Sequence, residues 1–332
     1  MKTQRLNKYE LYEAAQLIKD GEIVAFPTDT VYGLGADATN DTAVKKIFEA
    51  KGRPTNRPIS VLIGNYKDIE KYAVDVSDGV FKLAENFWPG PLTIVLKNGG
   101  LFAPSVTPGI NTVGLRMPDN PIALEFIQKS GTPLATPSAN TTGRPSPTIT
   151  EHVLADLDGK ISAVIDGGET SFGIESTVLD FSDPNYPILL RPGNISKAQI
   201  EEVIRQEVFL EQEKMDASQV SHQQSKHYEP RIPVFIVESS WEHAITNMQA
   251  KEEQIAILAN ASIIEKYQNE ICASFSLGEP HDLEAANRLL FQGLRALEQS
   301  EATIILDESY VNEEDSVAYM NRLESAANNK SI

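Results

Sequence analysis

The chain has 332 residues, of which 41% are hydrophobic and 23% charged, and its formal net charge is −18. This length predicts two domains, the composition excludes general disorder, and the single cysteine, Cys272, excludes a disulfide framework and a multi-cysteine zinc site. No apolar run reaches the ~18–20 residues of a membrane-spanning helix, and residues 1–20 lack the apolar core of a signal peptide. We therefore expect a cytosolic protein with no membrane partner.

The first two hundred residues alternate short apolar runs with helical patterns, which is typical of an α/β domain. Apolar residues at helical spacing predict helices at 11–18, 44–48, 80–87 and 123–127, and a capping-box pair, Ser196 and Gln199, opens another that ends near 207. Strands are predicted at 23–26, 59–63, 92–96, 112–116, 163–166, 177–181 and 188–190. The last two strands are too close in sequence for a crossover helix and should pair antiparallel. The expected sheet is therefore mixed and covered by helices, partly in the layout of an α+β fold.

Residues 208–232 differ in composition from the segments on either side. Glu, Gln, Ser and His dominate there, the apolar period is lost, and two prolines close the segment. The predicted division is a first domain at 1–207, a linker at 208–232 and a second domain at 233–332. Within the linker, His227-Tyr228 forms an aromatic pair that could close over a nucleotide, so we expect the linker to act as a lid.

The second domain shows a cleaner pattern. Apolar runs at 234–237, 255–258, 271–273 and 303–306 alternate with helical stretches, the best of which is 283–297. Such strand–helix–strand units predict a small parallel, Rossmann-like sheet. No Gly-x-Gly-x-x-Gly follows the first of these strands, which argues against a dinucleotide site there.

Charge is unevenly divided along the chain. Residues 1–205 hold 20 Lys and Arg against 25 Asp and Glu, whereas residues 206–332 hold 9 against 22. Broad nucleic-acid binding depends on Lys and Arg that neutralise phosphates, so this balance argues against it. A small anion could still bind where the few cations converge.

The first segment of chemical interest is Phe26–Asp37, directly after a predicted buried strand. It contains two threonines, two aspartates and two glycines, placed where open α/β sheets bind ligands. The simpler interpretation, a glycine-containing turn with Asx and threonine hydrogen bonds, carries about equal weight from the pattern alone.

The second segment is the loop 51–58, which contains Lys51, Arg53 and Arg57. Arg and Lys bind phosphoryl oxygens, and three cations in one Pro-rich loop of an acidic protein favour a functional role over surface ion pairs. The third segment, 134–148, supplies many hydroxyls, backbone N–H groups and one arginine, which suits anion and ribose contacts. Arg116 and Arg191 end two predicted strands, so both could reach the same cleft.

Taken together, these motifs resemble the YrdC-like family. The matching residues are Pro27-Thr28-x-Thr30-x-Tyr32-Gly33-Leu34, then Lys51-x-Arg53, then Pro137-Ser138-Ala139-Asn140 and Ser146, in this order. The chain looks most like the long, two-domain form of the L-threonylcarbamoyl-AMP synthases, with specific motifs over residues 6–206 and a looser likeness beyond. The resemblance implies a YrdC-like twisted mixed sheet flanked by helices in the first domain.

The resemblance also implies a reaction. Members take ATP, L-threonine and bicarbonate and release threonylcarbamoyl-adenylate and pyrophosphate, and a downstream complex then transfers the threonylcarbamoyl group to tRNA. Direct contact of this chain with tRNA is left open by the charge. Mg²⁺ is expected to accompany ATP, and the sequence identifies no protein ligand for a metal.

The same resemblance implies residue roles. L-threonine would be bound by Thr30, Arg116, Thr136 and Ser176. ATP would be bound by Arg53, Arg57, Thr112, Ser138, Ser146, Arg191 and Tyr228. Lys51 and Arg53 are the expected catalytic groups, and Lys51 would meet phosphate or carbamate charge.

The sequence departs from the family pattern at two places. Leu62 stands where many relatives carry a histidine near threonine, and 221–226 replaces a Pro-Gly-Met stretch before the His-Tyr pair. Two alternatives are weighed against the synthase. A carbamoyl-adenylate former of the hydrogenase-maturation type should carry zinc-binding cysteines that this chain lacks, and a tRNA-binding module is disfavoured by the acidic balance of residues 1–205.

Overall fold

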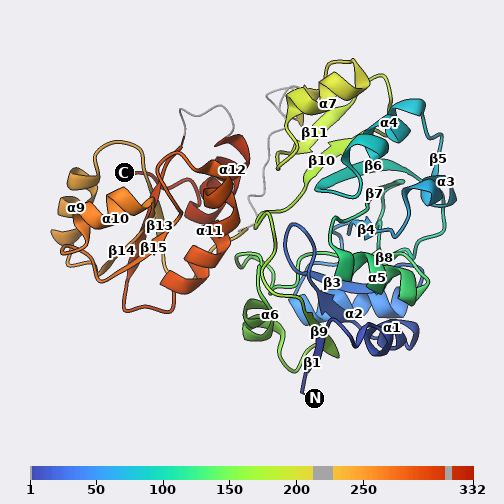
Figure 1. Ribbon diagram of the computed structural model, residues 1–332, viewed down its shortest axis with the longest axis horizontal. Helices are drawn as coiled ribbons and strands as arrows, with labels where there is room; N and C mark the ends of the chain where they lie inside the picture. Colours follow the sequence, from blue (N-terminus) through green and yellow to red (C-terminus); the bar gives the residue numbers. More distant parts are fainter. Residues whose placement is uncertain (1, 212–226, 311–315) are drawn as a thin grey trace. The chain divides into compact units, whose positions relative to one another are not determined.

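The computed structural model describes residues 2–211, 227–310 and 316–332, which form two compact units (Figure 1). The first unit comprises residues 2–142, 147–170 and 175–211. The second comprises the described residues from 227 onward together with two short segments, 143–146 and 171–174, that we had expected in the first domain. No helix among the described residues is long and apolar enough to cross a membrane.

The first unit is built on a large mixed sheet, as the sequence predicted. Its strands run in the order β1-β9-β2-β3-β8-β4-β7-β6-β10-β11-β12, and β5 pairs with β6. Their bounds are β1 Gln4–Asn7, β2 Val24–Phe26, β3 Gly33–Asp37, β4 Val61–Leu62, β5 Ala73–Val74, β6 Leu92–Asn98, β7 Thr112–Arg116, β8 Leu134–Ala135, β9 Ala163–Asp166, β10 Thr177–Asp180, β11 Ile188–Arg191 and β12 Phe209–Leu210. The predicted antiparallel pairing of the last two long strands, β10 and β11, is confirmed.

The helices of the first unit begin and end at the signals seen in the sequence. They are α1 Leu11–Lys19, α2 Asp41–Lys51, η1 Tyr66–Asp68, α3 Ile69–Tyr72, α4 Asp78–Phe87, α5 Pro121–Ser130, α6 Thr150–Leu157 and α7 Lys197–Ile204. Asn40 caps α2 through its side chain, and Gly52 ends that helix in the left-handed conformation. Ser196 and Gln199 form the predicted capping box of α7, although the helix ends at Ile204 rather than near 207.

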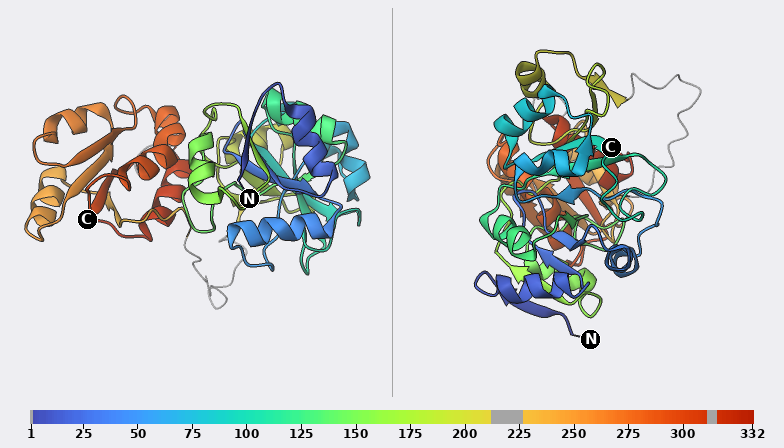
Figure 2. Two further views of the ribbon diagram at one scale, coloured as in Figure 1. Left: turned by 90° about the horizontal axis from the view of Figure 1, so that it is seen from below. Right: turned by 90° about the vertical axis from the view of Figure 1, so that its right-hand side faces the viewer.

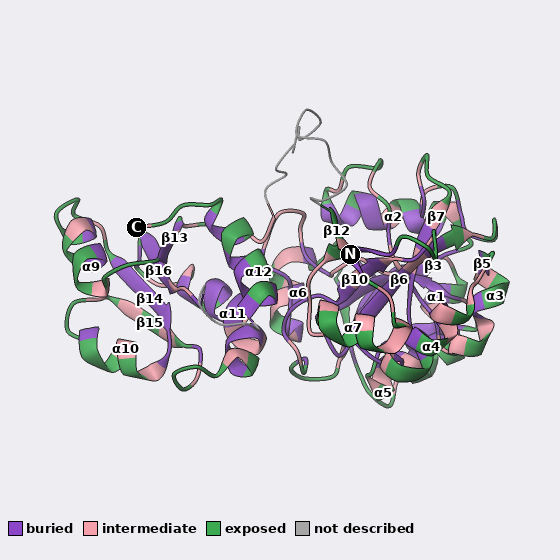
Figure 3. Cartoon of the chain, turned by 90° about the horizontal axis from the view of Figure 1, so that it is seen from above, coloured by how far each residue is buried: buried purple, intermediate pink, exposed green. Residues whose placement is uncertain are grey.

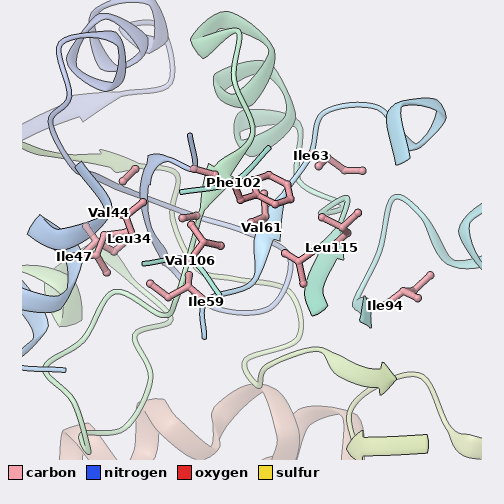
Figure 4. Close-up of a cluster of buried hydrophobic side chains, with 14 of the residues drawn as sticks. Leu34, Val44, Ile47, Ile59, Val61, Ile63, Ile94, Phe102, Val106 and Leu115 are labelled. Atoms are coloured by element: carbon pink, nitrogen blue, oxygen red, sulfur yellow. The ribbon is translucent and has the colours of Figure 1, made fainter. Parts of the chain in front are cut away.

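Two apolar clusters lie on opposite faces of the sheet. Side chains alternate along each strand, so Val113 and Leu115 of β7 enter one cluster, which also contains residues of α2 and α4 (Figure 4). The second cluster packs β2 and Leu62 against α1 and α5, where the Phe26 and Phe126 rings meet at 5.0 Å. Figure 3 shows that most residues in the central strands of the first unit are buried.

The second unit has the predicted parallel sheet, in the order β13-β16-β14-β15. Its elements are β13 Val234–Val237, α9 Trp241–Gln249, β14 Ile255–Ala259, α10 Ala261–Tyr267, β15 Ala273–Ser276, α11 Leu283–Leu297, β16 Ile304–Glu308 and α12 Val317–Ala327. Helices α9 and α10 lie on one side of this sheet and α11 and α12 on the other (Figures 1 and 2). The strand expected at 271–273 lies two residues later, because the edge strand β15 pairs only with β14 and does not need a continuous apolar run.

The expected linker begins later than predicted. Val208 is buried in the core of the first unit, and β12 adds to the sheet beside β11. Residues 212–226, which include the altered stretch at 221–226 and most of the predicted lid, lie outside the described residues. Tyr228 belongs to the second unit, where its ring packs on Phe291 with centroids 4.9 Å apart.

Residues at the C-terminal end of helix α11 form hydrogen bonds with the short segment 143–146, which belongs to the same unit. Arg295 donates from Nε and Nη2 to the carbonyl of Pro145 at 3.1 and 2.6 Å. Glu298 accepts two hydrogen bonds from the Arg144 guanidinium and a third from the backbone N–H of Arg231 at 2.9 Å. The Glu298 side chain is only 1% exposed, so this carboxylate depends on its partners for solvation.

We expect Glu298→Ala to lower the free energy of unfolding of the second unit by about 3 kcal/mol, because it removes one partner of a buried ion pair. Urea unfolding followed by circular dichroism measures the change. Glu301→Ala is the matched control, since Glu301 is exposed on the same segment. Equal losses in the two variants would show that the buried pair contributes nothing beyond a surface charge.

Candidate active site

On the sheet face that holds the second apolar cluster, the region around β7 carries small and polar side chains instead. On β7 the residues that alternate with the core positions are Thr112, Gly114 and Arg116. A Cβ placed on Gly114 would lie 3.0 Å from Thr93 Cγ2 and 3.1 Å from Ser60 Oγ, so these residues are neighbours on the same face. This polar face, made of Ser60, Thr93, Thr112, Gly114 and Arg116, contains two of the predicted site residues, Thr112 and Arg116.

Arg116 is the central cation of the polar face. It ends β7, is only 5% exposed, and donates from Nε to the Gly90 carbonyl at 3.0 Å. Nη1 donates to Thr30 Oγ1 at 2.8 Å, and Nη2 donates to Asp29 Oδ1. Two residues expected to bind threonine, Thr30 and Arg116, are therefore in direct contact.

The loop after β2 is held by its own threonines. Thr28 Oγ1 donates to the Val31 carbonyl at 2.7 Å and accepts from the Thr30 backbone N–H at 3.1 Å. Thr28, Asp29 and Thr30 are each at most 3% exposed. The loop is thus a rigid, buried turn, and both interpretations of this segment from the sequence are partly met: the hydrogen-bonded turn exists, and it presents polar groups to Arg116.

Two further predicted site residues, Ser176 and Arg191, are in contact with each other next to Thr93. Ser176 Oγ lies 2.8 Å from Thr93 Oγ1, and Arg191 donates from Nε to the Ser176 carbonyl at 3.0 Å and from Nη2 to Ser176 Oγ at 3.2 Å. Thr93, next to Gly114, connects this pair to the strand that ends in Arg116. The sequence predicted that Ser176 binds threonine and that Arg191 binds ATP. Because the two residues are in contact, these predicted binding positions are adjacent.

Thr136 lies against the glycine of the first motif. A Cβ on Gly33 would stand 2.3 Å from Thr136 Cγ2, so no larger residue fits at position 33 without displacing Thr136. Thr136 also donates its backbone N–H to the Ser60 carbonyl at 2.8 Å. These contacts place Thr136 at the edge of the polar face.

Lys51 ties the cationic loop to the Pro137–Asn140 motif. Its ammonium donates to the carbonyls of Ser138 and Asn140, the latter at 2.7 Å, and its own carbonyl accepts from the Thr142 N–H at 2.9 Å. The residue is 2% exposed, and this burial, followed by the charge of Arg53, lowers the pKa of the ammonium to about 7. An ammonium has three N–H donors, so one remains for a ligand.

Arg53 is held less completely. Nη2 donates to the Pro58 carbonyl at 3.0 Å, while Nε is buried and has no hydrogen-bond partner among the described residues. Burial, followed by the charge of Arg57, lowers the pKa of Arg53 to about 10, so the guanidinium remains charged at neutral pH. An arginine with an unsatisfied buried donor is suited to an oxyanion.

Three further predicted residues lie in different parts of the chain. Thr112 begins β7 on the polar face. Ser146 and Tyr228 belong to the second unit, where Ser146 is 1% exposed.

Leu62 occupies the position where relatives were expected to carry histidine. It is 4% exposed, packs in the apolar cluster of Phe26 and Phe126, and is the register partner of Arg116 in the β4–β7 pair. The side chain next to Arg116 on β4 is therefore apolar.

Potential metal ligands do not cluster in the described part of the chain. Within residues 2–211, 227–310 and 316–332, no group of three or more His, Cys, Asp and Glu side chains is placed to hold a metal ion. These residues do not fit a protein-bound metal centre.

Two residues of the site received no role from the sequence. Asp29 was part of the first motif, yet its pairing with Arg116 joins positions 87 residues apart. Thr93 lies between the core residues Leu92 and Ile94 of β6. A polar residue at this position of an apolar strand was the sequence signal that could have identified it.

Comparison with known protein families covers both units. Residues 16–193 match the family described as "Telomere recombination", and residues 195–328 match the C-terminal domain of threonylcarbamoyl-AMP synthases. The threonylcarbamoyl-AMP synthase of Bacillus subtilis is 40% identical over 333 residues, which cover 98% of this chain and 95% of the relative. The Pyrococcus abyssi enzyme of the same name is 37% identical over 334 residues, covering 98% and 96%.

Solved structures agree in fold. P. abyssi Sua5 complexed with L-threonine matches with a TM-score of 0.88 and 35% identity, covering 100% of this chain and 99% of that one. E. coli YciO matches with a TM-score of 0.53 and 23% identity over 58% of this chain and 96% of that one, a likeness of fold alone. The mixed fold predicted from the sequence is thereby confirmed.

The lowered pKa of Lys51 predicts a pH-dependent contribution to stability. Between its pKa of about 7 in the folded state and the ordinary 10.5, the unfolded chain holds a proton that the folded chain has lost. The free energy of unfolding of the wild type relative to Lys51→Met should therefore rise with pH across this window, by up to about 1.4 kcal/mol per pH unit. Urea unfolding at several pH values from 7 to 10 measures this difference, and a constant difference would contradict it.

Proposed function

The chain belongs to the threonylcarbamoyl-AMP synthase family, and on this premise we propose the reaction that its residues carry out. The enzyme condenses L-threonine, bicarbonate and ATP into threonylcarbamoyl-adenylate, with release of pyrophosphate and water. The amine of threonine first forms a carbamate with bicarbonate, and a carbamate oxygen then attacks the α-phosphorus of ATP. No covalent enzyme intermediate is needed.

The observation that carries this proposal is the polar face around Arg116. An amino acid needs a cation for its carboxylate, and Arg116 has five N–H donors, of which three are used by Gly90, Thr30 and Asp29 among the described residues. One N–H remains on each terminal nitrogen, which suits a carboxylate. The Thr30 hydroxyl contacts this cation, and Thr136 and Ser176 contact Ser60 and Thr93 of the polar face, in support of L-threonine as the ligand of Arg116.

ATP is proposed to bind beside this pocket. Arg53 uses one of its five N–H donors within the described chain, so four remain for phosphate oxygens. Arg191 adjoins Ser176, and Thr112 lies on the same strand face as Arg116. The family motifs also predict ATP contacts by Arg57 and Ser138. They predict the same role for Ser146 and Tyr228, which belong to the second unit.

Catalysis in this proposal depends on positioning and charge. Two anions, the carbamate and the triphosphate, must be brought together, and fixed cations in a partly dry site stabilise the charge that develops. Lys51 and Arg53 fill this role. Mg²⁺ would enter as part of the ATP complex, since the described residues do not form a metal centre.

The chemistry of the product requires a second reaction. Threonylcarbamoyl-adenylate is a mixed anhydride, so a downstream transfer complex must pass its threonylcarbamoyl group to tRNA. We propose a cytosolic location, which accords with a chain that has a single cysteine.

The direct test incubates the full chain with ATP, L-threonine and bicarbonate and looks for threonylcarbamoyl-adenylate by mass spectrometry. Product that requires all three substrates supports the proposal. Pyrophosphate release without this adenylate, or none at all, would contradict it.

We expect Arg53→Ala to lower kcat/KM for ATP by about 100-fold, because it removes a charged contact that strengthens in the transition state. The circular dichroism spectrum and the affinity for L-threonine should be unchanged. Lys71→Ala is the matched control, a cation that is 68% exposed in a surface ion pair. Near-normal turnover in a folded Arg53→Ala protein would remove the cationic loop from the mechanism.

A further inference from the structure

Asp29 has a buried oxygen that the folded protein leaves unused. The residue is 1% exposed and lies in the turn after β2, between Thr28 and Thr30. Its Oδ1 accepts from Arg116 Nη2, whereas Oδ2 has no hydrogen-bond partner among the described residues. A carboxylate oxygen without a donor inside a protein is costly, so its retention here calls for an explanation.

A counter-ion role alone does not account for this arrangement. Pairing with Arg116 requires only Oδ1, and it leaves Oδ2 unsatisfied. Burial raises the pKa of the Asp29 carboxyl, and the carboxylate of Asp119, in the segment after β7, adds to this rise. The charge of Arg116 and the backbone N–H groups of Asp29 and Asp119 act against this rise in pKa. A cationic ligand at Oδ2 would relieve both the missing hydrogen bond and the local excess of negative charge.

The ion pair offers both charges that an α-amino acid requires. Arg116 keeps one N–H on each terminal nitrogen, and the adjacent Asp29 keeps one oxygen. The carboxylate and the ammonium of an amino acid are attached to the same carbon, so a cation and an anion in contact with each other match their separation. Thr30, which shares Arg116 with Asp29, fixes the orientation of the pair.

We infer that Asp29 Oδ2 accepts a hydrogen bond from the α-amino group of L-threonine while Arg116 binds its carboxylate. This inference rests on the proposed function and assigns Asp29 as a substrate-binding residue that selects amino acids. The contact can persist through the reaction, because the nitrogen has three N–H groups as ammonium, two as amine and one as carbamate. Asp29 itself forms no covalent bond.

The test compares L-threonine with the 2,3-dihydroxybutyrate of the same stereochemistry, in which a hydroxyl replaces the amino group. Calorimetry measures both affinities for the full-length wild type and for Asp29→Asn, which keeps the size and an acceptor for Arg116 but puts an N–H donor in place of Oδ2. L-threonine should bind the variant about 10–100-fold more weakly, since a charge-assisted hydrogen bond is lost. The hydroxy acid should bind both proteins about equally.

The matched control is Asp119→Asn, which removes an exposed carboxylate near Asp29 without touching Oδ2. It should preserve the preference for L-threonine over the hydroxy acid. An unchanged preference in folded Asp29→Asn would overturn the inference. So would equal weakening of both ligands, which is what a purely structural role for Asp29 predicts.

A crystal structure of the wild type with L-threonine gives an independent answer that needs no substitution. The ligand nitrogen should lie within hydrogen-bond distance of Oδ2, about 3 Å, and a nitrogen directed elsewhere overturns the inference. The two proposals fail in different ways. Wild-type protein that binds no L-threonine and forms no adenylate contradicts the proposed function, whereas normal binding and turnover with an unchanged preference in Asp29→Asn contradicts only the assignment of Asp29.

Discussion

The need to satisfy one buried guanidinium organises the first unit. Arg116 is 5% exposed, and a cation removed from water must find hydrogen-bond partners within the protein. Its three partners come from two separate places in the chain: Gly90 before β6, and the neighbours Asp29 and Thr30 in the turn after β2. The ion pair therefore joins the middle of the sheet to the turn of the first motif.

Small residues make room for this polar face. Where Gly33 faces Thr136 and Gly114 faces Thr93, any side chain would collide at 2.3 and 3.0 Å. The alternate residues of the same strands bury valine, leucine and isoleucine in the core. Around β7 the two faces of the sheet thus differ: Val113 and Leu115 are packed in an apolar cluster, whereas Thr112, Gly114 and Arg116 form the polar face.

Much of this could be predicted from the sequence. Thr112–Arg116 was predicted with its observed bounds because apolar residues alternate along it, and the family and reaction were predicted from three motifs in order. Strand β3 was missed because Gly33 and Gly35 have low strand propensity, so the segment resembles a loop. The pairing of Asp29 with Arg116 had no local signal, because it joins residues 87 positions apart and depends on how β2 and β7 are brought together. No local signal in the sequence indicates that residues 143–146 group with the second unit, because this grouping depends on contacts with residues far along the chain.

The fold determines both the position and the pKa of the Lys51 ammonium. Two of its three N–H donors fix the carbonyls of Ser138 and Asn140, so the ammonium holds the third motif in place and keeps one donor for a ligand. The burial that makes this clamp rigid also lowers the pKa of Lys51 to about 7, which makes its positive charge costly in the free enzyme. An anion that binds beside Lys51 would stabilise the protonated form and raise that pKa again. Binding of an anion and protonation of Lys51 would therefore favour each other.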